Sequence, residues 1–209
     1  MTWICLLGAL ATFWLAGQSG RRALSVQRAR QLSDALEAWA AHAEGHGLTW
    51  QPAGVVGSVL HGVLKGRRIR AEITETPRVR QGEIVEVRLT VALRIGLPAA
   101  LELVYNPRLV PIGYTMVQPG HPEWGSGLMV QREHLSQVQT LFSPTTLDAV
   151  GRYLMAHDGR IHQGQLEAHI NGVPAPEGLL EEALAVAALI QEAWERRWRR
   201  LAQQLGLRF

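Results

Sequence analysis

Alternation between apolar and polar side chains constrains the fold of this chain more than any other feature. Over Ile84 to Ile95 every second residue is apolar, and the polar residues that stand between them are Glu86, Arg88, Thr90 and Arg94. The apolar members are Val85, Val87, Leu89, Val91 and Leu93. A period of two places successive side chains on opposite faces of a strand, so we expect one buried face and one solvated face.

The segments on either side of this strand continue the pattern. Residues 55–63 and 67–74 flank the turn Leu64-Lys65-Gly66, and residues 99–105 follow the turn Gly96-Leu97-Pro98. Four strands in succession, with one solvated face, predict an antiparallel meander. Residues 106–127 are rich in Pro and Gly, which predicts a loop or a pair of short edge strands, and residues 127–131 read as a further short strand.

A second hairpin is predicted over His157–Asn171. A two-residue turn at Gln163-Gly164 is the simplest way to connect its arms. This turn would place three pairs of residues opposite each other: Ile161 and Leu166, Arg160 and Glu167, and Asp158 and His169. The apolar pair would then lie on the core face and the two polar pairs on the solvated face.

Apolar residues spaced three and four apart predict helices over residues 22–44, 133–142, 145–155 and 179–205. Ser143 or Thr145 is suited to cap the third of these helices. The predicted fold class is therefore α+β: an antiparallel sheet of about six strands with helices packed on one face.

The N-terminus carries a long uncharged stretch. No charged side chain occurs between Met1 and Gly20, and about 20 helical residues reach the roughly 30 Å of a hydrocarbon core. We expect a membrane anchor over residues 1–20, followed by a single domain over residues 21–209. The anchor residues would be Trp3, Leu6, Leu7, Phe13, Trp14 and Leu15.

The positive charges that follow predict the orientation of this anchor. Arg21, Arg22, Arg28 and Arg30 all lie on the C-terminal side of the apolar stretch, and positive flanks stay in the cytoplasm. The domain is therefore expected on the cytoplasmic side of the membrane. A cleaved signal peptide with an exported domain is the alternative, since Ala16-Gly17 could precede a cleavage site.

Composition limits the chemistry. Cys5 is the single cysteine, so neither an intrachain disulfide nor a zinc site with several cysteines is possible. The 21 Lys and Arg side chains include one lysine, Lys65, and the formal net charge is +3. Such a preference for arginine reflects genome composition more often than binding to nucleic acid. We expect no cofactor.

Motifs that carry catalysis are missing from the sequence. Neither a phosphate-binding loop, nor a dinucleotide fingerprint, nor a G-x-S-x-G nucleophile turn occurs. His121 and Glu123 lie in a Pro-Gly loop and give one alternative, a metal-dependent hydrolase, although their spacing matches no established metal motif. The favoured expectation is a protein without enzymatic activity and without a bound metal.

The last predicted helix ends in a segment rich in Trp and Arg. Its interface candidates are Trp194, Arg196, Arg197, Trp198, Arg199 and Arg200. Three interpretations remain open: a helix end that packs its tryptophans on the domain or on a protein partner, a contact with anionic lipid, and binding to nucleic acid. The first is favoured, and nucleic acid is the least favoured.

The order of elements resembles a loosely defined set of bacterial membrane-anchored α+β proteins without an assigned activity. The resemblance covers residues 45–190 and includes the hairpin Gly62-x-x-x-Gly66-Arg67. A G-D-x-x-F-D-like motif of that set corresponds to residues 120–125, where His121 and Gly125 replace the acidic positions. The resemblance implies a membrane-associated domain. Together these features predict a membrane-anchored, non-enzymatic accessory subunit with a protein partner.

Overall fold

The structure is a computed structural model that describes residues 30–53, 56–78, 82–94, 101–106, 110–117 and 127–204. The predicted anchor residues, from Trp3 to Leu15, lie outside this part of the chain. His121 and Glu123 lie outside it as well. Within the described residues, no helix has both the length and the apolar character that crossing a membrane requires.

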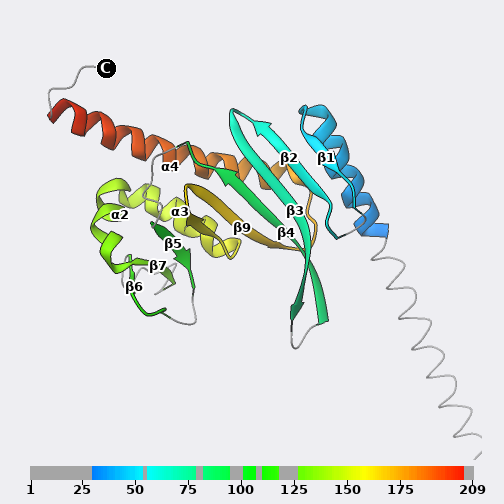
Figure 1. Ribbon diagram of the computed structural model, residues 1–209, viewed down its shortest axis with the longest axis horizontal. Coiled ribbons are helices and arrows are strands. Elements are labelled where there is room, and N and C mark those ends of the chain that lie inside the picture. Colours follow the sequence, from blue (N-terminus) through cyan, green and yellow to red (C-terminus); the bar gives the residue numbers. More distant parts are fainter. Residues whose placement is uncertain are drawn as a thin grey trace, which may run out of the picture.

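An antiparallel sheet forms the centre of the fold (Figure 1). Its nine strands within the described residues are β1 (Thr49–Gln51), β2 (Val59–Leu64), β3 (Arg67–Arg78), β4 (Gly82–Ala92), β5 (Glu102–Tyr105), β6 (Tyr114–Met116), β7 (Leu128–Gln131), β8 (Arg160–His162) and β9 (Gln165–Asn171). The α+β class is confirmed. The expected number of about six strands is wrong, because β1 and β6 have three residues each and are too short to show alternation.

The order of strands in space is β1-β2-β3-β4-β9-β8-β5-β7-β6. β2, β3 and β4 confirm the first three segments of the predicted meander, and β1 adds a strand that was not predicted. The expected pairing of the third segment, residues 84–95, with the fourth, residues 99–105, is wrong. β9 lies beside β4, and β5 pairs with β8 and β7. Alternation in a strand determines which of its faces is buried, but it does not determine which strand pairs with it. The hairpin of β8 and β9 can therefore lie between β4 and β5.

The helices form a second layer. They are residues 30–45, the short 3-10 turn η1 (Arg132–His134), α2 (Leu135–Leu141), α3 (Pro144–Ala156) and α4 (Pro176–Gln204). Figure 1 shows α4 crossing the sheet, residues 30–45 near β1, and α2 and α3 near β5 and β7. One core cluster joins these helices to the sheet, and the Trp39 indole donates a hydrogen bond to the Pro174 carbonyl at 2.8 Å.

The register of the sheet confirms the alternation predicted from the sequence. Ile69 of β3 lies opposite Val91 of β4, which in turn lies opposite Leu166 of β9, and all three are buried. The adjacent row is polar: Arg70 lies opposite Thr90, and Thr90 lies opposite Glu167. The apolar rows therefore face the helices, and the polar rows form the other face of the sheet.

Both predicted hairpin turns are present. Lys65 and Gly66 between β2 and β3, and Gln163 and Gly164 between β8 and β9, all have positive φ, as two-residue turns of this kind require. Positive φ explains the glycine in each turn, because a glycine adopts it without steric cost.

The predicted pairs of the late hairpin are confirmed in part. Ile161 lies opposite Leu166, and Arg160 lies opposite Glu167 with an ion pair of 2.6 Å. The Asp158–His169 pair is wrong. Asp158 has a φ of 45° in the turn before β8, and the His169 ring lies 3.5 Å from a carboxylate oxygen of Glu86 instead.

The Gly62-x-x-x-Gly66-Arg67 segment has a packing role. A Cβ atom on Gly62 would lie 2.8 Å from the Leu48 side chain, so the close approach of this strand requires glycine. Arg67 is only 9% exposed, and burial together with the nearby Arg94 lowers the pKa of its guanidinium. Glu195 of α4 acts in the opposite direction, which indicates that the hairpin lies close to the end of the long helix.

Candidate functional site

Two halves of α4 have different surroundings. We call residues 179–193 the proximal half and residues 194–204 the distal half. In the proximal half the apolar stripe is buried in the core: Leu179, Leu180, Ala183, Leu184, Ala187 and Ile190 all belong to the central cluster. Figure 1 shows the distal half extending beyond the strands, on the side of α2.

The distal half carries the two predicted tryptophans. Trp194 packs against the edge of the core cluster, whereas Trp198 is 53% exposed. Their rings are nearly parallel, with an interplanar angle of 3° and centroids 6.5 Å apart. Leu201, one turn further along the same stripe, is also exposed. The apolar stripe therefore continues past the point where the domain covers it.

The predicted arginines divide into two groups. Arg196, Arg197 and Arg200 line a pocket of about 580 Å³ between α4 and the segment that joins α2 to α3. Arg199 is exposed and does not line the pocket. A helix turns 100° per residue, so positions 196, 197 and 200 share the side that faces α2, and position 199 does not.

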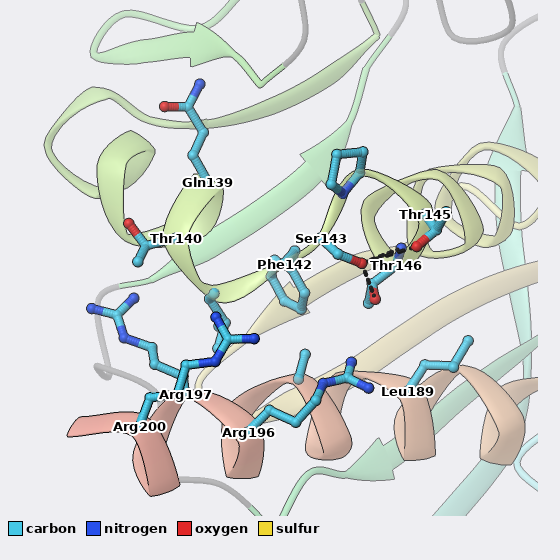
Figure 2. Close-up of a pocket in the computed structure, with 13 residues that line it drawn as sticks. Gln139, Thr140, Phe142, Ser143, Thr145, Thr146, Leu189, Arg196, Arg197 and Arg200 are labelled. Atoms are coloured by element: carbon cyan, nitrogen blue, oxygen red, sulfur yellow. Dashed lines mark hydrogen bonds between the residues drawn. The ribbon is translucent and has the colours of Figure 1, made fainter. Parts of the chain in front are cut away.

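The opposite wall of the pocket consists of the end of α2 and the start of α3 (Figure 2). The remaining lining residues are Gln139, Thr140, Leu141, Phe142, Ser143, Pro144, Thr145, Thr146, Leu189 and Ala193. Hydroxyl groups dominate its polar part, and Phe142, Leu141 and Leu189 supply apolar surface. None of these residues was predicted as a site residue. Those from Gln139 to Thr146 lie more than 40 positions before the arginines, and only the packing of α4 brings the two sets together.

Ser143 is the cap of α3, as predicted. Its hydroxyl accepts a hydrogen bond from the Thr146 amide at 3.2 Å and lies 3.0 Å from the Thr145 hydroxyl and 2.9 Å from the Thr146 hydroxyl. Pro144 occupies the first helical position, where no amide hydrogen is needed. Three hydroxyls therefore cluster where α3 begins, at the end of the helix that carries partial positive charge.

The three pocket arginines have few partners in the chain. Arg197 donates to the Gln137 carbonyl at 3.3 Å, and Arg196 lies 3.9 Å from a carboxylate oxygen of Glu192. Arg200 has no hydrogen bond or ion pair with any residue that the structure describes. Among the described lining residues there is also no Asp or Glu. The described lining of the pocket therefore carries three positive charges and no negative charge, and Glu192, outside the lining, lies near one of the three.

Two histidines of the described chain are held in separate contacts with carboxylates. His157 lies 3.1 Å from Glu182 of α4, and His169 lies near Glu86. No group of three or more His, Cys, Asp or Glu side chains is placed to hold a metal ion among the described residues. His121 and Glu123 are outside that part of the chain, so the hydrolase alternative stays a prediction.

Comparison with known proteins gives one likeness in fold. No family model matches the sequence, and no curated protein sequence matches it. The crystal structure of the mycobacterial trehalose monomycolate transport factor A, TtfA, is similar with a TM-score of 0.51. The similarity covers 78% of this chain and 94% of that chain, at 12% sequence identity. The two chains therefore share an overall fold.

Proposed function

We propose that this chain is a non-enzymatic accessory subunit of a bacterial membrane-associated assembly. Residues 1–20 tether it to the membrane, and the distal half of α4 docks onto a protein partner. The single observation that carries this proposal is the exposed continuation of the apolar stripe, at Trp198 and Leu201, beyond the core.

The chemistry of the distal half indicates what the partner offers. Tryptophan and arginine are the residues most enriched at the centres of protein interfaces. Trp198 is exposed between arginines at positions 196, 197, 199 and 200. The complementary surface is an apolar cleft bordered by carboxylates, because such a surface both buries the indole and matches the positive charge.

The likeness in fold supports a role of this kind. The similar structure is that of a transport factor, which is a protein that serves a transport process. An accessory role in a membrane assembly agrees with the uncharged N-terminal stretch and with the arginines that follow it. The domain then stands on the cytoplasmic side of the membrane.

The test is photo-crosslinking of the full chain in membranes of its native host. A photoreactive residue is placed at Arg199, the exposed neighbour of Trp198, in one variant and at Arg88, on the exposed polar face of the sheet, in the other. We expect one partner protein to be crosslinked from position 199 and not from position 88.

A second variant makes this test quantitative. Trp198→Ala combined with Leu201→Ala should lower co-purification of that partner more than about tenfold, since truncation of an interface tryptophan costs about 2 kcal/mol or more. Arg88→Gln is the matched control and should leave co-purification unchanged. Equal crosslinking from both positions, or a full-length chain that purifies as a lone monomer without detergent, would contradict the proposal.

Membrane topology is tested through the single cysteine. Replacing Cys5 by Ser and placing a cysteine at Ala175, an exposed position before α4, gives a chain with one reactive thiol in the domain. In intact cells we expect this thiol to be protected from a membrane-impermeant maleimide and to react after the cells are opened. Labelling of intact cells would mean that the domain is exported.

A further inference from the structure

We infer that the pocket between α4 and the start of α3 binds a phosphate monoester that carries an apolar group. Arg196, Arg197 and Arg200 border both this pocket and the docking surface proposed above, whereas Trp198 and Leu201, the apolar part of the docking surface, do not line the pocket. The pocket lies on the α2 side of α4, whereas Trp198 and Leu201 continue the stripe that faces the sheet in the proximal half. The inference holds whether or not the distal half has a protein partner.

Charge is the first argument. Arg196, Arg197 and Arg200 all line the same pocket, and no described lining residue is acidic. Figure 2 shows their guanidinium groups on the side of α4 that faces Thr140, Phe142 and the beginning of α3. Three cations side by side repel one another, and an anion among them removes this cost. Because Arg200 has no partner within the described chain, its N–H donors are available to that anion.

The number of donors selects the kind of anion. Each guanidinium carries five N–H donors in a planar fork, which matches carboxylate or phosphate oxygens in pairs. A single carboxylate has two oxygens and can occupy one fork. A phosphate monoester has three terminal oxygens and a charge of about −1.5 to −2 near pH 7, so it can bridge several arginines at once. The pocket therefore fits a phosphate better than a carboxylate.

The opposite wall adds neutral donors. The hydroxyls of Thr145 and Thr146 lie 3.0 Å and 2.9 Å from the Ser143 hydroxyl, so the three form one cluster. Hydroxyl hydrogens rotate, so this cluster can turn a donor toward an anion in the pocket. The partial positive charge at the start of α3 acts in the same direction. These groups supplement the arginines, which carry the inference.

The size of the pocket indicates that the phosphate is attached to something. A volume of about 580 Å³ lies in the range of sites for organic ligands, which is far larger than one phosphate group needs. Leu141, Phe142, Leu189 and Ala193 line the rest of the pocket and provide apolar surface. We therefore assign to it an apolar phosphate monoester, either a soluble compound or the headgroup of a lipid.

The experiment uses the full chain in micelles of an uncharged detergent. Binding is followed by titration calorimetry with phenyl phosphate as the soluble probe and with phosphatidic acid in mixed micelles as the lipid probe. We expect saturable binding of one molecule per chain. Binding of phenyl phosphate supports a soluble ligand, and binding of phosphatidic acid alone supports a lipid headgroup. Absence of saturable binding with both probes overturns the inference.

Variants show whether the pocket is responsible. The triple variant Arg196→Gln, Arg197→Gln, Arg200→Gln should weaken binding about a hundredfold or more, because each charge-assisted contact contributes roughly a factor of ten. The matched control removes three exposed arginines on other elements: Arg30→Gln, Arg68→Gln, Arg88→Gln. It should change the affinity less than about threefold, as expected for distant charges screened by salt. An equal loss in both variants would mean diffuse attraction and would overturn the inference.

A single substitution guards against loss of folding. Arg200 makes no hydrogen bond or ion pair with a described residue, so we expect Arg200→Gln to keep the fold and to weaken binding about tenfold. Unchanged affinity in this variant would contradict the inference. Phenylacetate tests the class of anion: binding as tight as that of phenyl phosphate would overturn the assignment to phosphate. So would binding of a single-stranded oligonucleotide when both monoesters fail to bind.

Discussion

The proximal and distal halves of α4 belong to one uninterrupted helix but have different roles. In the proximal half, Leu180, Ala187 and Ile190 are buried against the sheet, and the helix is held by its packing. In the distal half, Trp198 and Leu201 occupy the same stripe and are exposed. Ala202 is a buried exception. The pattern of apolar residues is thus continuous although the core is not.

The difference shows what an amphipathic pattern can and cannot indicate. A period of 3.6 residues predicts a helix with one apolar face, whatever covers that face. The proximal half uses this face for folding, and the distal half leaves it available to another molecule. Substitutions in the two halves should therefore separate stability from binding.

The largest expected effect tests the proximal half. Leu180→Ala removes a side chain that is 1% exposed and should lower the free energy of unfolding by about 2–5 kcal/mol, because it leaves a cavity in the core. Trp198→Ala in the distal half should change it by less than about 1 kcal/mol, although more atoms are removed. Urea denaturation of both variants measures the difference, and similar values would show that the two halves do not differ.

The dependence of stability on pH tests whether the hydroxyl of Tyr153 is shielded from water in the folded core. Tyr153 of α3 is buried, and its hydroxyl has no hydrogen-bond partner among the described residues. Burial, and then the charge of Glu182, raise the pKa of Tyr153 well above its usual range. Above about pH 10 the unfolded chain loses this proton and the folded chain keeps it, so stability should fall by up to about 1.4 kcal/mol per pH unit.

The control for this titration is Tyr153→Phe. The variant removes the ionisable group. Its free energy of unfolding, measured by urea denaturation, should therefore fall less between pH 10 and 11 than that of the wild type. Below pH 9 it should be at least as stable, because it removes a buried hydroxyl without a described partner. If the free energy of unfolding fell equally steeply with pH in the variant and in the wild type above pH 10, Tyr153 would have to ionise in the folded chain.

A smaller effect is expected where the pocket meets α3. Ser143→Ala removes the side chain that caps the helix and should lower the free energy of unfolding by about 1 kcal/mol. Thr145→Ala, at an exposed neighbouring position, is the matched control and should cost less. Thermal unfolding of the two variants measures the difference. Equal losses in the free energy of unfolding would mean that the Ser143 cap does not stabilise α3.

The smallest effect sharpens the comparison from the distal side. Glu192→Gln breaks the contact of 3.9 Å with Arg196, and an exposed helix pair of this kind is worth no more than about 0.5 kcal/mol. The variant should therefore unfold at nearly the wild-type urea concentration. A loss above 1 kcal/mol would place the distal arginines among the residues that hold the fold together.

Much of the fold could be predicted because its local patterns are strong. The buried face of β4, the hairpin turns at Lys65-Gly66 and Gln163-Gly164, and the cap at Ser143 all follow from residues close together in the chain. The partner of β4 could not be predicted. Leu166 and Ala168 of β9 lie opposite Val91 and Leu89 of β4. The alternation in β5 would have allowed that strand to pair with β4 equally well.

The candidate site was predicted from one side only. Arginines next to tryptophans at the end of a helix mark a binding surface, and this pattern is local. Which arginines share a pocket depends on where α2 and α3 pack, and that depends on contacts between distant residues such as Arg197 and Gln137. Prediction from sequence therefore named Arg196 to Arg200 as a group and could not separate Arg199 from the others.

The two strands at the ends of the sheet also limit how this protein can meet other molecules. β1 and β6 have three residues each, with Pro52 directly after β1. A long, flat edge strand invites another chain to extend the sheet through its backbone, which is the route to aggregation and to strand exchange. Edges this short give such a chain little to pair with. The side chains of the described surface, and not these strand edges, therefore offer the groups that another molecule could recognise.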